Sequence, residues 1–192
     1  MTINQLAGKL KEALDSVKVK CFLVADTARL ANEGNLSDVS VFTVGVKAED
    51  FVKKTTEIAE ALNKEFAEVG GVAQDIFSKK GFTRAFKLNF EKFLVVVAAY
   101  FTDGENRICP FTVNEMALTF PVELLDDMKK KKIGNKWFSV PSPIEDYLEA
   151  TYFEDGRMKK QMVTAPLELP EDEEEFEDEE LPEDEIEEEP EE

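Results

Sequence analysis

The sequence contains few types of side chain that could catalyse a reaction or bind a metal. The chain has 192 residues, with no histidine, two cysteines and 42 Asp and Glu residues. The absence of histidine excludes Ser-His-Asp and Cys-His catalysis, a His-rich metal site and an imidazole pH switch. Cys21 and Cys109 fall in or beside apolar stretches typical of strands, which predicts two buried thiols in a reducing compartment. Carboxylates therefore remain as the main candidates for chemistry.

Those carboxylates are concentrated at the C-terminus. From Glu168 to Glu192 there are 18 acidic residues and no basic one, which leaves 24 acidic and 23 basic residues in the first 167. The formal net charge of −19 thus belongs almost entirely to residues 168–192, here called the acidic tail. Such a segment repels itself and cannot bury enough apolar area to offset its ordering entropy. We expect residues 1–163 to form one domain and residues 164–192 to be disordered.

Apolar residues punctuate the acidic tail, and the sequence "LPED" occurs in it twice. Acidic residues with spaced apolar ones are typical of a segment that engages a basic, partly apolar surface on another protein. Phe176, Leu181 and Ile186 are the residues that we expect to contact such a partner. Two alternatives are a solubilising appendage and a segment that covers the chain's own Lys129–Lys132. Direct nucleic-acid binding is disfavoured because polyanions repel each other, whereas competition with nucleic acid for a basic site is allowed.

No segment predicts a membrane protein. The longest apolar run, Phe93–Phe101, is far shorter than the ~20 residues that a membrane-spanning helix needs. The N-terminus is polar and helical in pattern, unlike a signal peptide. We therefore expect a soluble protein of the cytoplasm without a membrane partner.

The patterns in the first 163 residues predict an α+β fold, in which a mixed sheet is covered by helices. A capping box of Thr2 with Gln5 begins a helix over about 3–17, and Ser142 with Pro143 begins a last helix. A further helix is expected over 48–69. Strands are expected over 19–25, 39–46, 83–88, 92–101, 107–113 and 137–140. Residues 25–37 form a polar connection in this interpretation, and Lys129–Lys132 a loop.

Two segments carry a resemblance to a known family. Cys21–Phe51 is an apolar strand followed by a turn, a polar loop, a second strand and an acidic-aromatic pair at the start of a helix. Phe120–Tyr152 has "FP" before a Lys-rich loop, an aromatic strand and a helix containing "YL". Together with the hairpin strand between them, they resemble the LicD/fukutin-related family of the nucleotidyltransferase fold. The resemblance implies a nucleotidyltransferase-like mixed sheet.

The resemblance also implies where a metal would bind. Nucleotidyl or phosphoryl transfer in such a family needs two or three carboxylates that converge on Mg²⁺ or Mn²⁺. Asp38 falls on the first position of the family's Asp-x-Asp pair and is the candidate catalytic and metal-binding residue. Ser40 falls on the second position, and Val96 on that of the third acid. By itself, Asp38 is better explained as a turn or cap acid at the start of a strand than as a metal ligand.

Phosphate binding is implied at the turn after the first strand. Thr27 and Arg29 fall where the family would bind phosphate, and Asp26 replaces the family's glycine before the Thr or Ser. An aspartate there would repel a triphosphate. The alternative is that Thr27 and Arg29 simply begin a short helix.

Three functions follow as hypotheses. The first is a catalytically degenerate LicD-like protein without a cofactor, acting as a binding or assembly module through its tail. The second is an active Mg²⁺- or Mn²⁺-dependent transferase that moves a nucleotidyl or phospho-alcohol group onto a glycan, with Asp26, Asp38, Glu91 or Asp103 as carboxylates. The third is an acidic inhibitor or nucleic-acid mimic. Small size, lost acids and an acidic tail together favour a phage-borne protein, found in the host cytoplasm or the virion.

Overall fold

A computed structural model describes residues 1–77, 81–103, 105–109, 116–159 and 161–162. Its helices are α1 (Ile3–Ser16), α2 (Ala25–Glu33), α3 (Ala48–Lys53), α4 (Thr55–Phe66) and α5 (Ile144–Thr151), with 3-10 turns η1 (Leu36–Asp38), η2 (Ala67–Val69) and η3 (Val122–Leu125). Its strands are β1 (Cys21–Leu23), β2 (Val41–Lys47), β3 (Gln74–Phe77), β4 (Thr83–Asn89), β5 (Leu94–Asp103), β6 (Asn106–Cys109), β7 (Met116–Pro121), β8 (Lys129–Ile133), β9 (Lys136–Val140) and β10 (Gln161–Met162).

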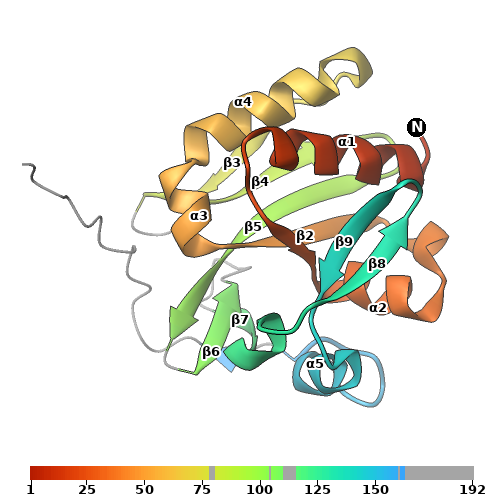
Figure 1. The fold of residues 1–192 in the computed structure, drawn as a ribbon, viewed down its shortest axis with the longest axis vertical. Coiled ribbons are helices and arrows are strands. Elements are labelled where there is room, and N and C mark those ends of the chain that lie inside the picture. The colour runs from red at the N-terminus through yellow and green to blue at the C-terminus, as the bar shows by residue number, and fades with distance from the viewer. Residues whose placement is uncertain (78–80, 104, 110–115, 160, 163–192) are drawn as a thin grey trace, which may run out of the picture.

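The strands form one mixed sheet (Figure 1). Its order is β10-β7-β6-β5-β2-β1-β9-β8, and β4 with its neighbour β3 pairs with β5 beside this path. The pairs β2–β5 and β1–β9 are parallel, whereas the other pairs are antiparallel. The predicted α+β class, with a mixed sheet flanked by helices, is therefore confirmed.

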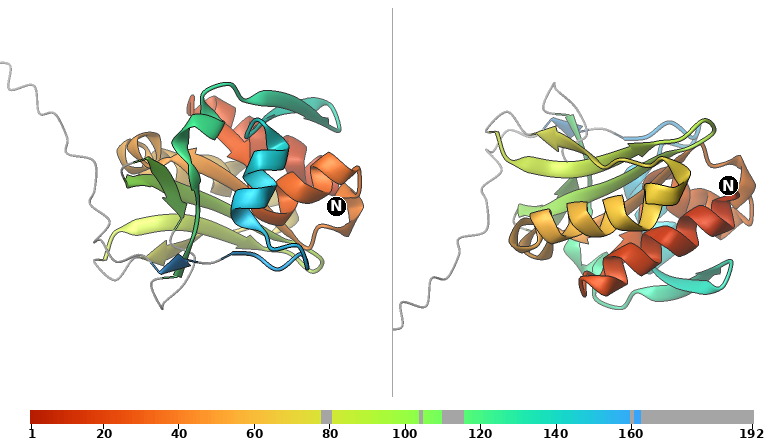
Figure 2. Two further views of the ribbon diagram at one scale, coloured as in Figure 1. Left: turned by 90° about the horizontal axis from the view of Figure 1, so that it is seen from below. Right: turned by 90° about the horizontal axis from the view of Figure 1, so that it is seen from above.

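The two faces of the sheet are covered differently. Side chains alternate along a strand, so Phe42, Val44 and Val46 of β2 lie on one face, with α1, α3 and α4 packed over it (Figure 2). Thr43 and Gly45 lie on the other face, here called the α5 face. It is covered by a contact chain of the rings Phe22–Tyr100–Phe120–Tyr147. Of the described helices, none is long and apolar enough to cross a membrane.

The two segments that carry the family resemblance meet in space. β1 pairs with β9, with Phe22 opposite Ser139. The backbone N–H of Ala25 donates a hydrogen bond to the Tyr147 hydroxyl over 2.7 Å. The predicted capping box at the start of α1 is confirmed as well, because Thr2 and Gln5 exchange hydrogen bonds between side chain and backbone.

Several predicted elements were wrong in type or extent. Residues 25–33 form helix α2 rather than the connection expected over 25–37, in agreement with the alternative that Thr27 and Arg29 belong to a short helix. Its buried Ala25, Ala28 and Ala31 repeat at a helical spacing, and Gly34 in the left-handed region ends it. The helix expected over 48–69 is interrupted at Lys54, which separates α3 from α4. Ser142 does not cap α5: the N-cap is Pro143, without a side-chain hydrogen bond.

Lys129–Lys132 was predicted as a loop and is instead part of β8. These lysines pair in register with Val140, Ser139, Phe138 and Trp137 of β9. A run of lysines disfavours a strand by propensity, but an edge position lets the charged groups reach solvent. Strands β3 and β7 were not predicted. Of the strand expected over 107–113, residues 107–109 belong to β6, and 110–113 lie outside the described residues.

Gly45 permits the closest contact of the α5 face. A Cβ atom at this position would lie 2.5 Å from Phe22 Cε2 and 2.9 Å from Tyr100 Cδ2. Both rings are buried, so neither has room to withdraw. Glycine is thus required here by packing.

We predict that Gly45→Ala destabilises the protein by about 1–3 kcal/mol, because overpacking forces the Phe22 and Tyr100 rings to shift. Gly8→Ala in α1 is the matched control. Its Cβ would have 3.9 Å to the nearest atom, Asn135 Oδ1. Alanine favours a helix interior over glycine by about 0.5–1 kcal/mol, so this variant should be slightly more stable. Urea unfolding curves measure both, and equal effects of the two variants would contradict the analysis.

Candidate functional site

The turn between β1 and α2 is the first part of the candidate site. Ala25 opens α2 with φ of +51°, in the left-handed region that favours glycine. The resemblance placed the family's glycine at Asp26, so the glycine-like backbone lies one residue earlier than predicted. The hydrogen bond from the Ala25 N–H to Tyr147, which is fully buried, holds this conformation.

Thr27 lies inside the protein. Its side chain is 0% exposed, and its hydroxyl accepts a 2.7 Å hydrogen bond from the Thr43 N–H and donates to the Val41 carbonyl over 3.3 Å. The hydroxyl thus joins α2 to the beginning of strand β2. Phosphate binding by Thr27 stays a prediction, and it would require these two hydrogen bonds to be exchanged.

Asp26, Arg29 and Tyr152 form a cluster beside this turn. Asp26 Oδ1 accepts hydrogen bonds from Tyr152 Oη at 3.0 Å and from Arg29 Nη2 at 3.2 Å. The Arg29 guanidinium also pairs with Glu33 at 3.1 Å and lies 5.7 Å from the centre of the Tyr152 ring. Burial, and next the Asp26 carboxylate, raise the pKa of Tyr152 above its ordinary value. The cluster ties α2 to the end of α5.

This cluster limits what Asp26 and Arg29 can do chemically. A cation bound by Asp26 would face the positive charge of Arg29 at 3.2 Å. A phosphate bound by Arg29 would compete with the carboxylates of Asp26 and Glu33. Their roles as catalytic and phosphate-binding residues remain predictions.

The other candidate carboxylates do not join this cluster. Asp38 ends η1 with an exposed side chain, and its Oδ1 accepts a 3.3 Å hydrogen bond from Ser37 Oγ. Glu91 lies in the bend between β4 and β5 and is also exposed. Asp103 ends β5, and its side chain is outside the described residues. Within the part of the chain that the structure describes, no three His, Cys, Asp or Glu residues gather as a metal site would require.

The register of β2 and β5 shows where converging side chains would stand. Thr43 lies opposite Val96 in this parallel pair, so both point to the α5 face, and Val41 shares that face two residues before Thr43. If Val96 stands at the position of the third acid, as the resemblance implies, Val41 and Thr43 form a pair at i and i+2 that faces it. Asp38 and Ser40 precede the strand. These three facing positions carry two valines and a threonine.

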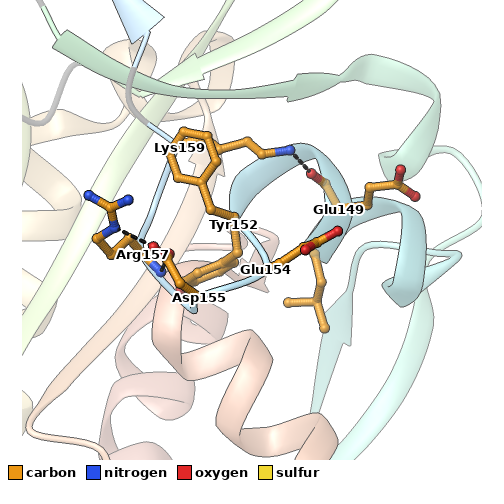
Figure 3. Close-up of a pocket in the computed structure, with 8 residues that line it drawn as sticks. Glu149, Tyr152, Glu154, Asp155, Arg157 and Lys159 are labelled. Carbon is orange, nitrogen blue, oxygen red and sulfur yellow. Dashed lines mark hydrogen bonds and ion pairs between the residues drawn. The ribbon is translucent and has the colours of Figure 1, made fainter.

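A shallow pocket lies on the outer side of Tyr152 (Figure 3). Its two cations form hydrogen bonds within the pocket wall: Arg157 Nε donates to the Asp155 carboxylate at 2.7 Å, and Lys159 Nζ donates to the Glu149 backbone carbonyl at 2.6 Å. Both cations also lie within 6 Å of the centre of the Phe153 ring.

The two cysteines and the apolar tail residues were the other residues singled out in the sequence. Cys21 is buried and not in a disulfide, and burial raises the pKa of its thiol to about 11. The side chain of Cys109, like Phe176, Leu181 and Ile186 of the acidic tail, lies outside the described residues. Tyr152 was noted only as the end of the second segment. No spacing rule links it to Asp26, which is 126 residues away.

The chain was compared with known proteins. No protein-family model matches it, and no curated protein is significantly similar to it. Solved structures that match include the antibiotic-resistance factor ANT(2'')-Ia in solution, with 12% identity and a TM-score of 0.45. The match covers 72% of this chain and 64% of that one, so this chain spans less than two thirds of it.

Two further structures match at a similar level. One is the crystal structure of ANT(2'')-Ia in complex with adenylyl-2''-tobramycin, with 12% identity, a TM-score of 0.43, and 72% and 68% of the two chains covered. The other is a protein from Thermotoga maritima provisionally assigned as a nucleotidyltransferase, with 15% identity, a TM-score of 0.44, and 75% and 80% covered.

We predict that Thr27→Val destabilises the protein by about 1–3 kcal/mol, because the buried Thr43 N–H loses its acceptor. Thr27→Ser keeps the hydroxyl and should cost only about 0.8 kcal/mol for the lost methyl group. Amide hydrogen exchange at Thr43 separates the two effects. Exchange should be faster in the valine variant alone, and equal exchange in both variants would contradict the role of the hydroxyl.

Proposed function

We propose that this protein is a catalytically degenerate, LicD-like member of the nucleotidyltransferase fold that acts as a binding or assembly module through its acidic tail. The observation that carries the proposal is the register of β2 and β5. Val41, Thr43 and Val96 occupy the three mutually facing positions on the α5 face. None of these side chains can supply the negative charge that a hard divalent cation requires.

Burial at these positions supports the proposal. Thr43 is 3% exposed and Val96 8% exposed, whereas Val41 at the start of β2 is 39% exposed, so little water reaches the two inner positions. Two of the carboxylates that the sequence offers as metal ligands are not available at these positions. Asp26 is paired with Arg29, and Asp38 lies in η1 before β2 begins. One exposed carboxylate with water ligands is a weak site for Mg²⁺ or Mn²⁺.

The charge distribution supports the binding role. The acidic tail holds 18 of the 42 acidic residues and spaces its apolar residues among them. We propose that Phe176, Leu181 and Ile186 enter apolar sites on a partner whose surrounding surface is basic. Long-range attraction would speed the encounter, and the apolar contacts would select the partner.

Manganese titration of the full-length protein tests the catalytic half of the proposal. Mn²⁺ is paramagnetic and broadens amide resonances near its binding site. We predict that low Mn²⁺ concentrations broaden resonances of Glu168–Glu192 only, because a dense polyanion collects cations without a defined cage. Thr43, Val96 and Ala25 should keep their line widths.

The matched variant for this titration is Asp38→Asn. Broadening around Thr43 at the same Mn²⁺ concentration as the tail, abolished by Asp38→Asn, would overturn the degenerate assignment. It would favour the metal-dependent transferase instead, and assays for nucleotidyl transfer would then follow.

Removal of residues 168–192 tests the role of the tail. We predict that the shortened chain melts within a few degrees of the full-length protein but self-associates more readily. The reason is that the first 167 residues carry 24 acids and 23 bases, and nearly neutral proteins lose mutual repulsion. Thermal melting and sedimentation velocity measure the two quantities. A shortened chain that fails to fold would show that the tail is part of the domain.

A further inference from the structure

The β8–β9 hairpin presents a basic and aromatic surface at one edge of the sheet. Lys130 pairs in register with Ser139, and Lys132 with Trp137, so these four side chains share a face. Trp137 is 56% exposed although it is a large aromatic residue. The Lys132 ammonium lies 5.9 Å from the centre of its ring. We call Lys129–Lys132 with Trp137 the lysine edge.

The positive charge of the lysine edge is not neutralised within the described residues. From Met128 to Ile144 the sequence has five lysines and no acidic residue. Of these lysines, only Lys136 forms an ion pair among the described residues, with Glu12 of α1 at 2.8 Å. Lys130 Nζ donates to the uncharged Ser139 hydroxyl at 2.7 Å. The lysine edge is therefore a concentrated cationic site without a counter-charge among the described residues.

The same edge is open to a further segment of chain. β8 ends the strand order and pairs only with β9 among the described strands. Lysines on an edge strand repel another copy of the same edge, which prevents sheets from joining. They do not repel a polyanion. The edge thus selects by charge what can lie along it.

We propose that the lysine edge is the docking site of the chain's own acidic tail. The tail offers the matching chemistry, since carboxylates can pair with the lysines while Leu or Phe side chains contact the Trp137 ring. An exposed indole beside a lysine offers an apolar plane within a cationic field. A solubilising tail would need no such counterpart on the domain.

The length of the chain allows this contact within one molecule. The described chain ends at Met162 in β10, at the opposite end of the strand order from β8. Seven strand spacings amount to on the order of 34 Å along the sheet. Extended chain covers about 3.4 Å per residue, so roughly ten residues after Met162 bring the tail to β8. The segment from Glu173 to Glu192 remains to dock.

Docking of the tail does not depend on the proposed function, whereas the regulation that would follow from it rests on the proposed binding of a partner by the tail. A docked tail holds its apolar residues on the lysine edge, where no partner can bind them. A basic partner would have to compete with the lysine edge for the tail. The tail is then both the ligand of the domain and the ligand of the partner.

Fluorescence of Trp137 tests the docking in the full-length protein, without any partner. Trp137 is the single tryptophan of the chain, so its emission reports on the lysine edge alone. Acrylamide, a neutral quencher, measures how accessible the indole is. Raising the salt from about 0.01 M to about 1 M shortens the Debye length from about 30 Å to about 3 Å and should release the tail. We expect the quenching constant to rise about two-fold over this range.

Two charge-matched variants control the experiment. Lys129→Gln with Lys131→Gln removes two of the four charges of β8 on the face opposite to Trp137, without touching the Lys132–Trp137 contact, and should weaken the salt dependence. Lys53→Gln with Lys64→Gln removes two charges from exposed positions on α3 and α4 and should leave it unchanged. A third variant, with Glu177, Asp178, Glu179 and Glu180 changed to their amides, should behave like the first.

Three results would overturn the proposal. One is a quenching constant that does not respond to salt. Another is the same loss of response in the Lys53/Lys64 variant, which would assign the effect to net charge. The third comes from carbodiimide coupling of lysines to carboxylates at low protein concentration. Links between Lys129–Lys132 and the tail within monomers support docking in one molecule, whereas links found only in dimers would make a second copy the occupant.

Discussion

The close packing of two aromatic rings above Gly45 is the constraint on which the α5 face depends. Phe22 of β1 and Tyr100 of β5 meet there with ring centres 5.5 Å apart, and a glycine in β2 leaves the space for them. Phe120 continues the contact from Tyr100, and Tyr147 continues it from Phe120 at 5.1 Å. The Tyr147 hydroxyl then accepts the Ala25 N–H. One line of contacts thus runs from the middle of the sheet to the start of α2.

Because of this packing, the polar groups of the turn after β1 form hydrogen bonds within the protein. The backbone at Ala25 keeps the left-handed conformation that a glycine would favour, but its N–H is used by a buried tyrosine. Thr27 keeps a hydroxyl, but the hydroxyl holds β2. The Ala25 N–H and the Thr27 hydroxyl are groups that could bind a phosphate in such a turn. Here they join α2 to α5 and to β2. The facing residues Val41, Thr43 and Val96 are apolar or neutral, which is the observation behind the proposed degenerate assignment.

Sequence patterns predicted the parts of the fold that depend on local chemistry. Helix α1 was recognised because Thr2 and Gln5 complete a capping box, and β5 because a long apolar run needs cover on both faces. The patterns failed where tertiary contacts decide. Lysines in β8 form a strand only because β9 lies beside them, and the Asp26–Tyr152 contact joins residues 126 positions apart. Only the register of β2 with β5 shows that Val41 and Thr43, rather than Asp38 and Ser40, face Val96.

The proposed contact between the acidic tail and the lysine edge depends on charge rather than on the packing of the fold. Single exposed ion pairs contribute only about 0–1 kcal/mol each, so no one pair could hold the acidic tail on the lysine edge. Several such pairs acting together, with apolar contact at Trp137, would give a contact that forms and breaks readily. Tethering raises the effective concentration of the tail near the edge, which favours it over a free anion of equal affinity. A basic partner with deeper apolar sites could still win the competition. The weakness of each pair is therefore what would make the contact a regulator rather than a fixed part of the structure.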